Sequence, residues 1–174
     1  MDNMINNFSD TLIASELNPL ISTEDDLFGK FIGKWDFKLK YYSLNKTSHE
    51  YVGSWIFERV LNGLAIQDLW VIPSLEGKGF HEYGTSLRSF DLKTKKWKVT
   101  WVGPMQNQYF VFDVERINKE IHLKLISQND PKMRWVFYEI APNEFQWRSE
   151  VFLTEESKWF MNCHMSLTKS DNVD

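Results

Sequence analysis

The chain contains a single cysteine, Cys163, among its 174 residues, so no disulfide can form within it. It also lacks a run of basic residues, and its formal net charge is −4 at pH 7. Nucleic acids and anionic membrane surfaces attract basic patches, so we expect neither as a partner. The low cysteine content is typical of a reducing compartment, and we expect a cytoplasmic protein.

Long apolar runs are absent as well. No stretch approaches the roughly 18 consecutive apolar residues that indicate a membrane-spanning helix. The N-terminal "MDNMINNFSDTLIASELNPL" has acids and amides but no basic region followed by an apolar run. It therefore does not resemble a signal peptide. From both patterns we expect no membrane partner.

Aromatic residues, in contrast, are abundant. The sequence has 8 Trp, 13 Phe and 6 Tyr, which together make 16% of the chain. Such side chains favour strands, and they supply large apolar areas to cores and binding sites. The composition thus favours a β-rich domain with an aromatic interior.

Apolar and polar residues alternate from Trp35 onward. Trp35, Phe37, Leu39 and Tyr41 are separated by charged residues, as expected for a strand with one buried face. Similar runs separated by short turn-like segments predict further strands over Tyr51–Val60, Leu64–Pro73, Glu82–Phe90, Trp97–Val102, Tyr109–Arg116, Ile121–Leu125, Met133–Ile140, Phe145–Leu153 and Trp159–Thr168. A meander of about ten antiparallel strands must hide its edges, and closure into an up-and-down β-barrel does so.

The N-terminal residues lack this alternation. The segment "SDTLIASELNPL" predicts a short helix capped by Ser9 or Asp10. We therefore expect residues 1–30 to form a helical or partly disordered cap over one end of an all-β barrel that spans residues 31–170.

Hairpin turns determine which residues lie opposite one another in neighbouring strands, and opposite residues share a face. A turn at "INKE" pairs Phe112 with Leu125. A turn at "APNE" pairs Tyr138 with Trp147. In the first hairpin apolar residues meet apolar ones and acids meet bases, which supports that register.

The last hairpin has two possible registers. A five-residue turn at "TEESK" pairs Arg148 with His164 and Glu150 with Asn162, on a face shared with Trp135. A four-residue turn would instead shift the last strand by one residue and exchange its two faces. The sequence leaves open which face lines the barrel interior.

Three segments together form a longer pattern of tryptophans and turns: "GSWIFERVLNGLAIQDLW", "SLRSFDLKTKKWKVTWVGP" and "EFQWRSEV". A Gly33-x-Trp35 strand start precedes them. Together they resemble an uncharacterised lipocalin-like family of the calycin superfamily, with its GxW start, VLxG turn and YDxxTxxW hairpin, although Phe90 stands in place of the Tyr. The resemblance covers Phe31 to Lys169. It implies an antiparallel calycin barrel with a small-molecule cavity and no fixed catalytic residues.

The sequence departs from the relatives of that family at two points. Lipocalins place an Arg late in the last strand over the GxW tryptophan, and the nearest candidate here is Lys169. Related haem-binding barrels open with a Gly-rich strand, whereas this strand continues "DFKLKYY". His164 lies near the C-terminus, as the haem ligand does in those barrels, but we expect no cofactor.

Arg148, Glu150 and His164 form the candidate catalytic group. A carboxylate, an imidazole and a guanidinium beside aromatic rings could perform general acid–base chemistry or bind the polar end of a ligand. The alternative is a cross-strand salt-bridge patch on the outer face of the sheet, which is common in antiparallel sheets and stabilises little.

A second set of residues predicts ligand contacts. If Phe90 pairs with Trp97, Arg88 lies among tryptophans, where it could bind an anion or simply stack in a closed barrel end. Asp68 lies on an otherwise apolar strand face, as a candidate base or as an acid satisfied by a nearby donor. The predicted ligand-binding residues are Arg88, Trp101, Trp135, Phe137, Asp68 and Trp70.

The sequence predicts no metal site. Its four histidines lie on separate segments without metal-ligand spacing, at His49, His81, His122 and His164. Cys163 alternates with Met161 and Met165 on an apolar face. We therefore expect a buried, inert thiol rather than a nucleophile.

These observations lead to three hypotheses on function. The first is the binding of a small hydrophobic or aromatic molecule in an aromatic-lined barrel cavity. The alternative is a cofactor-free enzyme, such as a cyclase, isomerase or lyase, that acts on such a molecule in a biosynthetic pathway. The third is an interaction module that forms a homodimer through an aromatic outer face.

Overall fold

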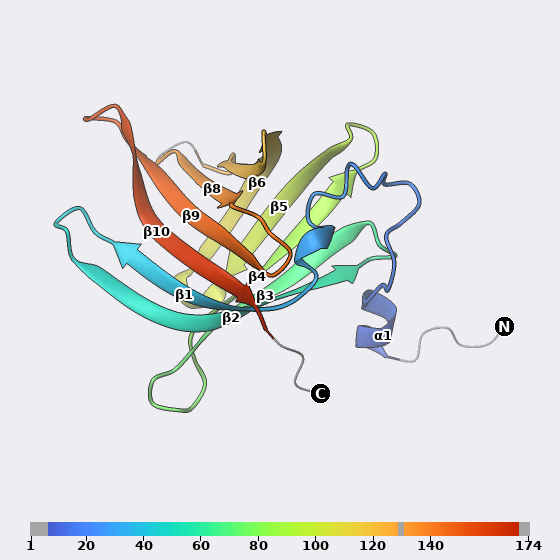
Figure 1. The fold of residues 1–174 in the computed structure, drawn as a ribbon, viewed down its shortest axis with the longest axis horizontal. Coiled ribbons are helices and arrows are strands. Elements are labelled where there is room, and N and C mark those ends of the chain that lie inside the picture. The colour runs from blue at the N-terminus through green and yellow to red at the C-terminus, as the bar shows by residue number, and fades with distance from the viewer. Residues whose placement is uncertain (1–6, 129–130, 171–174) are drawn as a thin grey trace.

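The protein is a closed antiparallel β-barrel of ten strands, as seen in a computed structural model that describes residues 7–128 and 131–170 (Figure 1). A short helix and a 3-10 helix precede the barrel, α1 (Phe8–Leu12) and η1 (Gly29–Phe31). The strands are β1 (Gly33–Tyr42), β2 (Ser48–Val60), β3 (Ala65–Pro73), β4 (Phe80–Asp91), β5 (Lys96–Gly103), β6 (Gln108–Ile117), β7 (Glu120–Leu125), β8 (Met133–Tyr138), β9 (Glu144–Leu153) and β10 (Lys158–Lys169), with the 3-10 helix η2 (Pro104–Gln106) between β5 and β6. The predicted all-β barrel is confirmed.

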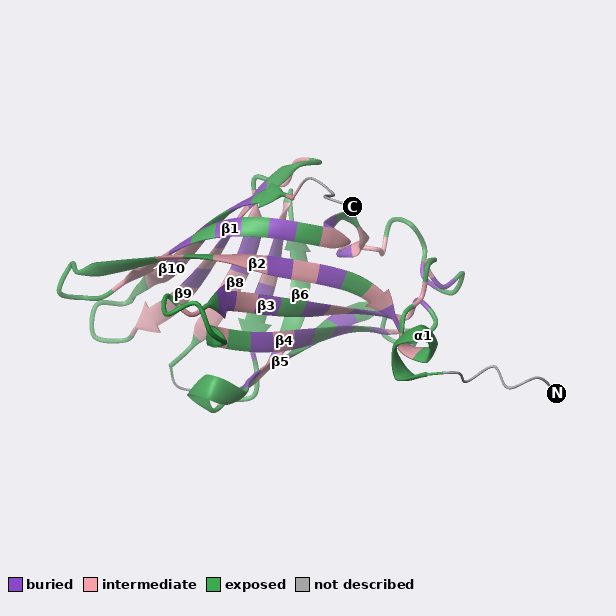
Figure 2. Cartoon of the chain, turned by 90° about the horizontal axis from the view of Figure 1, so that it is seen from below, coloured by how far each residue is buried: buried purple, intermediate pink, exposed green. Residues whose placement is uncertain are grey.

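Each strand pairs with the next one along the chain, and β10 closes the barrel by pairing with β1. In β1 the predicted alternation holds, since Trp35, Phe37 and Leu39 are buried while Asp36 and Lys38 are exposed. Figure 2 shows the same alternation of buried and exposed bands along the neighbouring strands. None of the helices within the described residues is long and apolar enough to cross a membrane.

The tryptophan of the GxW start meets the last strand where the barrel closes. Trp35 lies opposite Lys169 in the β1–β10 register. The Lys169 ammonium lies 5.6 Å from the centroid of the Trp35 ring, within the range of a cation–π contact. Lys169, the residue that the sequence offered for this position, thus packs over the tryptophan.

The N-terminal helix is shorter than the sequence predicts, and its cap is a different residue. Helix α1 ends at Leu12, and Asn7 caps it by accepting a hydrogen bond from the Asp10 amide at 2.9 Å. The chain then extends along the end of β2, where the Ala14 amide donates to the Arg59 carbonyl at 2.8 Å. This backbone pairing replaces further helical turns. The predicted caps Ser9 and Asp10 are therefore wrong.

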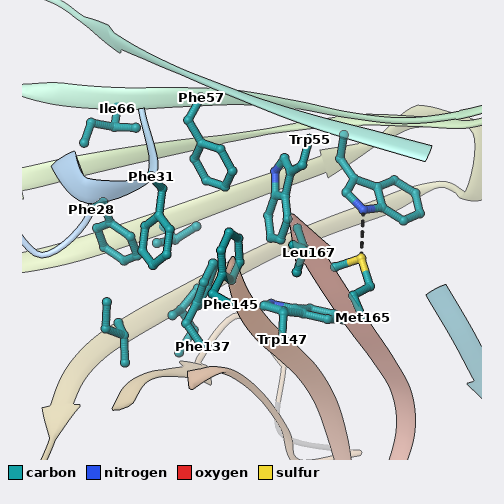
Figure 3. Packing of buried hydrophobic residues seen from close by; sticks show 14 of the residues in the cluster. Phe28, Phe31, Trp55, Phe57, Ile66, Phe137, Phe145, Trp147, Met165 and Leu167 are labelled. Atoms are coloured by element: carbon teal, nitrogen blue, oxygen red, sulfur yellow. Dashed lines mark hydrogen bonds between the residues drawn. The ribbon is translucent and has the colours of Figure 1, made fainter. Parts of the chain in front are cut away.

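The segment between α1 and β1 fills one end of the barrel, which we call the closed end. Phe28 and Phe31 are fully buried there, and Figure 3 shows both rings among aromatic side chains from the strands. The Phe31 ring lies 4.7 Å from the Phe145 ring, and the Phe28 ring lies 5.4 Å from the Trp97 ring. The Trp97 indole N–H donates to the Asp25 carbonyl at 2.7 Å, which holds the segment in place.

Two of the predicted hairpin registers are confirmed and one is wrong. Phe112 lies opposite Leu125, and Phe90 lies opposite Trp97. Tyr138, however, lies opposite Gln146 and not Trp147. The reason is that Glu139 adopts a positive φ of 49°, which ends β8 early and shifts the pairing by one residue. The shift turns the rings of Trp135 and Phe137 toward the interior.

The last hairpin combines both registers that the sequence allowed. Lys158 lies opposite Leu153 across a four-residue turn, and Glu150 lies opposite Met161. A β-bulge at Asn162 then shifts the register, so that Arg148 lies opposite His164 as predicted. The predicted pairing of Glu150 with Asn162 is wrong, because Asn162 is the extra residue of the bulge.

Candidate functional site

A cavity of about 140 Å³ lies inside the barrel toward the end opposite Phe28 and Phe31, which we call the open end. It is surrounded by residues of β1 to β6 and of β8 to β10, together with the 3-10 helix η2. The lining residues are Tyr41, Trp55, Trp70, Glu82, Trp101, Gln106, Gln108, Phe110, Met133, Trp135, Trp147, Ser149, Asn162, Cys163 and Met165.

Five of the lining residues are tryptophans from five different strands, and we call them the tryptophan belt. Successive ring centroids are 6.1 Å apart for Trp70 and Trp101, 5.9 Å for Trp101 and Trp135, 5.5 Å for Trp135 and Trp147, and 6.1 Å for Trp147 and Trp55. The rings meet edge to face, an arrangement that aromatic pairs prefer. The belt therefore presents both ring faces and ring edges to the cavity.

Small residues make room for one member of the belt. A Cβ atom at Gly84 would overlap the six-membered ring of Trp101, and one at Gly103 would come within 2.9 Å of the Trp101 indole nitrogen. That nitrogen donates a hydrogen bond to the Gln108 side chain at 3.2 Å. The two glycines and the glutamine thus hold Trp101 against the barrel wall.

The polar atoms of the other belt tryptophans differ in whether they have a partner. The Trp70 indole N–H lies 3.4 Å from the Met165 sulfur, the contact that is dashed in Figure 3. The indole nitrogens of Trp55 and Trp147 are buried without a hydrogen-bond partner among the described residues, as is the Asn162 amide oxygen. A bound molecule with polar atoms could satisfy some of these groups.

The rim of the cavity carries its ionisable side chains. The Tyr41 hydroxyl donates to a Glu82 carboxylate oxygen at 3.1 Å. Burial raises the pKa of Glu82, and the Tyr41 hydrogen bond and nearby His81 oppose this only in part. Burial likewise raises the pKa of the Tyr41 hydroxyl and of the Cys163 thiol. Both therefore stay protonated at neutral pH, and Cys163 is the buried, unreactive thiol that the sequence predicts.

No lysine, arginine or histidine is among the lining residues. Among the described lining residues, Glu82 carries the one carboxyl group, since the remaining side chains are aromatic, aliphatic, amide, hydroxyl, thioether or thiol groups. The cavity is therefore apolar around its walls and acidic at its rim.

The structure places the predicted anchors Arg88 and Asp68 outside the cavity lining. They form a buried ion pair at 2.5 Å in the closed end, and Asp68 also accepts from the Ser86 amide at 2.7 Å. The Arg88 guanidinium lies 5.0 Å from the Phe57 ring centroid and 5.2 Å from that of Phe28. The alternative noted from the sequence, a stack in the barrel end with a satisfied acid, is the arrangement observed.

Phe137 also lies in the closed end rather than at the cavity. Its ring is fully buried 5.1 Å from that of Phe31. Of the six predicted ligand-binding residues, the structure brings together Trp70, Trp101 and Trp135 as members of the belt. The other three, Arg88, Asp68 and Phe137, are core residues beneath it.

Arg148, Glu150 and His164 lie on the outer face of the barrel, because their neighbours Trp147 and Ser149 face the cavity. The expected shared face with Trp135 is wrong, as a consequence of the shifted β8–β9 register.

On that outer face Arg148 and Glu150 belong to an ion-pair network, and His164 lies opposite Arg148 in the β9–β10 register. The Arg148 guanidinium lies 3.3 Å from the Glu150 carboxylate, 3.7 Å from that of Glu120, and 4.5 Å from the Tyr138 ring centroid. Burial lowers the pKa of His164, and the charge of Arg148 acts in the same direction. No histidine lines the cavity, so His164 is not placed as an axial ligand inside the barrel would be.

Sequence reasoning missed Glu82 and its partner Tyr41 as site residues. Both carried a usable signal. Tyr41 continues the inward face of Trp35, Phe37 and Leu39, and Glu82 alternates with inward-facing Gly84. Their contact joins residues 41 positions apart, so only the closed barrel shows that they meet.

Comparison with known proteins supports the fold. No protein-family model and no curated protein matches the chain. Among solved structures it is similar to Rv2717c from M. tuberculosis, with a TM-score of 0.62 over 90% of this chain and 100% of that one, at 9% sequence identity. Such a likeness concerns the fold alone. The chain is thus a ten-stranded antiparallel barrel with an aromatic cluster, an architecture compatible with the calycin fold.

Proposed function

We propose that this protein binds a small apolar or aromatic molecule in the cavity at the open end of the barrel. The observation that carries the proposal is the tryptophan belt around a space of about 140 Å³. An apolar cavity of about 150 Å³ is large enough to hold benzene. The cavity therefore suits a single six-membered ring or a group of similar volume, with polar substituents directed toward the rim.

Family membership is part of the same proposal. We place the chain as a distant member of the lipocalin-like calycin barrels, because Gly33 and Trp35 begin β1 and Lys169 packs over the Trp35 ring. Barrels of this size commonly enclose one small ligand.

Binding is preferred over the enzymatic alternative for a structural reason. The cyclase, isomerase or lyase hypothesis relied on Arg148, Glu150 and His164, and none of these residues lines the cavity. On the outer face, Arg148 forms ion pairs with Glu150 and Glu120, and His164 is partly buried.

Tryptophan fluorescence offers a direct test, because a ligand in the belt contacts five indoles. Toluene, phenol and benzyl alcohol should each change the emission in a saturable manner. Ser149→Phe places a ring inside the cavity and should abolish binding while the barrel stays folded. Ser166→Phe makes the same change on the exposed face of β10 and should leave binding intact. Equal binding by both variants, or no response of the parent protein to any of these ligands, would overturn the proposal.

A further inference from the structure

The charges around the cavity are unevenly compensated. In the closed end, the buried cation Arg88 has its own carboxylate partner, Asp68. On the outer face, Arg148 and Arg134 share the carboxylate of Glu150. At the rim, the hydrogen bonds among the described residues give Glu82 one side-chain partner, the neutral Tyr41 hydroxyl.

We propose that the molecule bound in the cavity is a cation: a single-ring amine or quaternary ammonium compound whose ring lies in the tryptophan belt and whose nitrogen contacts Glu82. This inference rests on the proposed function, since it assigns the ligand class of the same site. Three properties of the site support it, namely the sign of its charge, the chemistry of its walls, and the position of the carboxylate.

The acidic group at the rim argues against an anionic ligand. An anionic ligand such as a carboxylate would enter a cavity without any lysine, arginine or histidine in its lining. It would also approach Glu82, where like charges repel in a partly desolvated space. A cation is favoured instead, because it pairs with a carboxyl group that has no lysine or arginine partner among the described residues.

The walls favour a cation as well. The faces of tryptophan rings carry negative potential, and tryptophan is the strongest of the aromatic side chains in cation–π contacts. Five indoles around one cavity of about 140 Å³ form a cage of the kind that binds ammonium groups.

The position of Glu82 explains how one molecule can use both features. Glu82 pairs with Ile72 near the β3–β4 turn, whereas Gly84, two residues further along β4, lies against the Trp101 ring. The Glu82 carboxylate is therefore nearer the rim than the Trp101 ring by two residues along β4. That separation matches a ring joined to an ammonium group by a one-carbon linker.

The raised pKa of Glu82 is consistent with a site that binds an ammonium group beside this carboxylate. Burial raises this pKa, and a bound ammonium group would lower it again. The titratable groups around Glu82 are Tyr41 on β1, Tyr51 on β2, His81 on β4 and Cys163 on β10. Of these, only His81 can gain a positive charge, and its ring stacks on Tyr51 at 4.8 Å.

Three ligands that share a ring and differ in charge test the proposal: benzylamine, benzyl alcohol and benzoate. The parent protein should bind benzylamine about tenfold more tightly than benzyl alcohol, with benzoate weakest. Glu82→Gln should reduce the preference for benzylamine and leave the affinity for benzyl alcohol unchanged. The preference that remains measures the cation–π contribution of the tryptophan belt. Glu76→Gln is the matched control, because it makes the same change at an exposed glutamate between β3 and β4, outside the cavity lining, and should keep the preference.

The outcomes separate the two levels of inference. Binding of benzyl alcohol without a preference for benzylamine, or a preference that is undiminished in Glu82→Gln, overturns the cation proposal and leaves the binding function standing. Failure of all three ligands to bind overturns both.

A pH titration gives a second test that needs no change at Glu82. Benzyltrimethylammonium keeps its charge at every pH, so its binding reports the protein groups alone. Its affinity should fall as the pH drops through the raised pKa of Glu82, whereas that of benzyl alcohol should stay constant. His81→Asn should retain this fall, because the carboxylate causes it. A flat profile for benzyltrimethylammonium overturns the proposal.

Discussion

The two ends of the barrel are built from the same kinds of side chain and differ in what fills them. At the closed end, Phe28 and Phe31 from the N-terminal segment occupy the space between strands, and the buried cation Arg88 is paired with Asp68. At the open end no helix or loop of the described residues fills the interior, and five indoles surround a cavity in which the Glu82 carboxyl group has no lysine or arginine partner among those residues. Aromatic density alone therefore does not indicate a binding site. The presence or absence of a chain segment that fills the barrel end decides between core and cavity.

The largest effect on stability is expected from removing the contact of the N-terminal segment with the closed end. Phe31→Ala should lower the free energy of unfolding by about 4 kcal/mol, because it leaves a cavity among packed rings. Phe8→Ala is the control, since Phe8 is 79% exposed and its loss should cost less than about 0.5 kcal/mol. Urea unfolding measures both. Similar values for the two variants would mean that the segment does not stabilise the closed end.

The next effect concerns the buried ion pair. Arg88→Met should destabilise the protein by about 3 kcal/mol, because it leaves the Asp68 carboxylate buried without its cation. The double variant Arg88→Met with Asp68→Leu should recover part of this loss. Ligand binding in the surviving folded fraction should be unchanged if the pair serves only the closed end. A selective loss of binding would assign Arg88 to the site after all.

A smaller effect on stability, with a clear effect on binding, is expected at the open end. Gly84→Ala should displace the Trp101 ring into the cavity and cost about 1–3 kcal/mol of stability. The affinity for benzyl alcohol should fall about tenfold, the equivalent of 1.4 kcal/mol. Gly77→Ala changes a glycine with open space around it, although its φ of +76° adds strain, so it controls for stability without affecting the cavity. Unchanged affinity in Gly84→Ala would show that Trp101 does not line the site.

The smallest effect is expected from the rim carboxylate in the absence of ligand. Burial raises the pKa of Glu82, so the folded state binds a proton more tightly than the unfolded state. The ionised carboxylate therefore lowers stability above the raised pKa and has no effect where both states are protonated. Glu82→Gln should stabilise the protein at neutral pH, by less than about 1 kcal/mol because the group is half-exposed. Urea unfolding at neutral and at strongly acidic pH should show this gain only at neutral pH.

Much of the fold could be predicted from the sequence, because strand alternation is a local pattern. The inward face of Trp35, Phe37 and Leu39 and the pairing of Phe112 with Leu125 follow from residue spacing alone. The β8–β9 register could not be predicted, since it depends on the left-handed backbone of Glu139, a non-glycine residue without a turn signature. The bulge at Asn162 is similar, because the sequence permitted both turn lengths and the structure uses both.

The sequence by itself thus determined a closed aromatic barrel, since its period of two and its short turns leave few other ways to bury so many rings. Only the tertiary structure decided which rings are core and which surround a cavity. The reason is physical: burial of Arg88 against Asp68, filling of one end by Phe28 and Phe31, and the meeting of Tyr41 with Glu82 are contacts between distant residues. Such contacts exist only once the barrel has closed, so no local pattern encodes them.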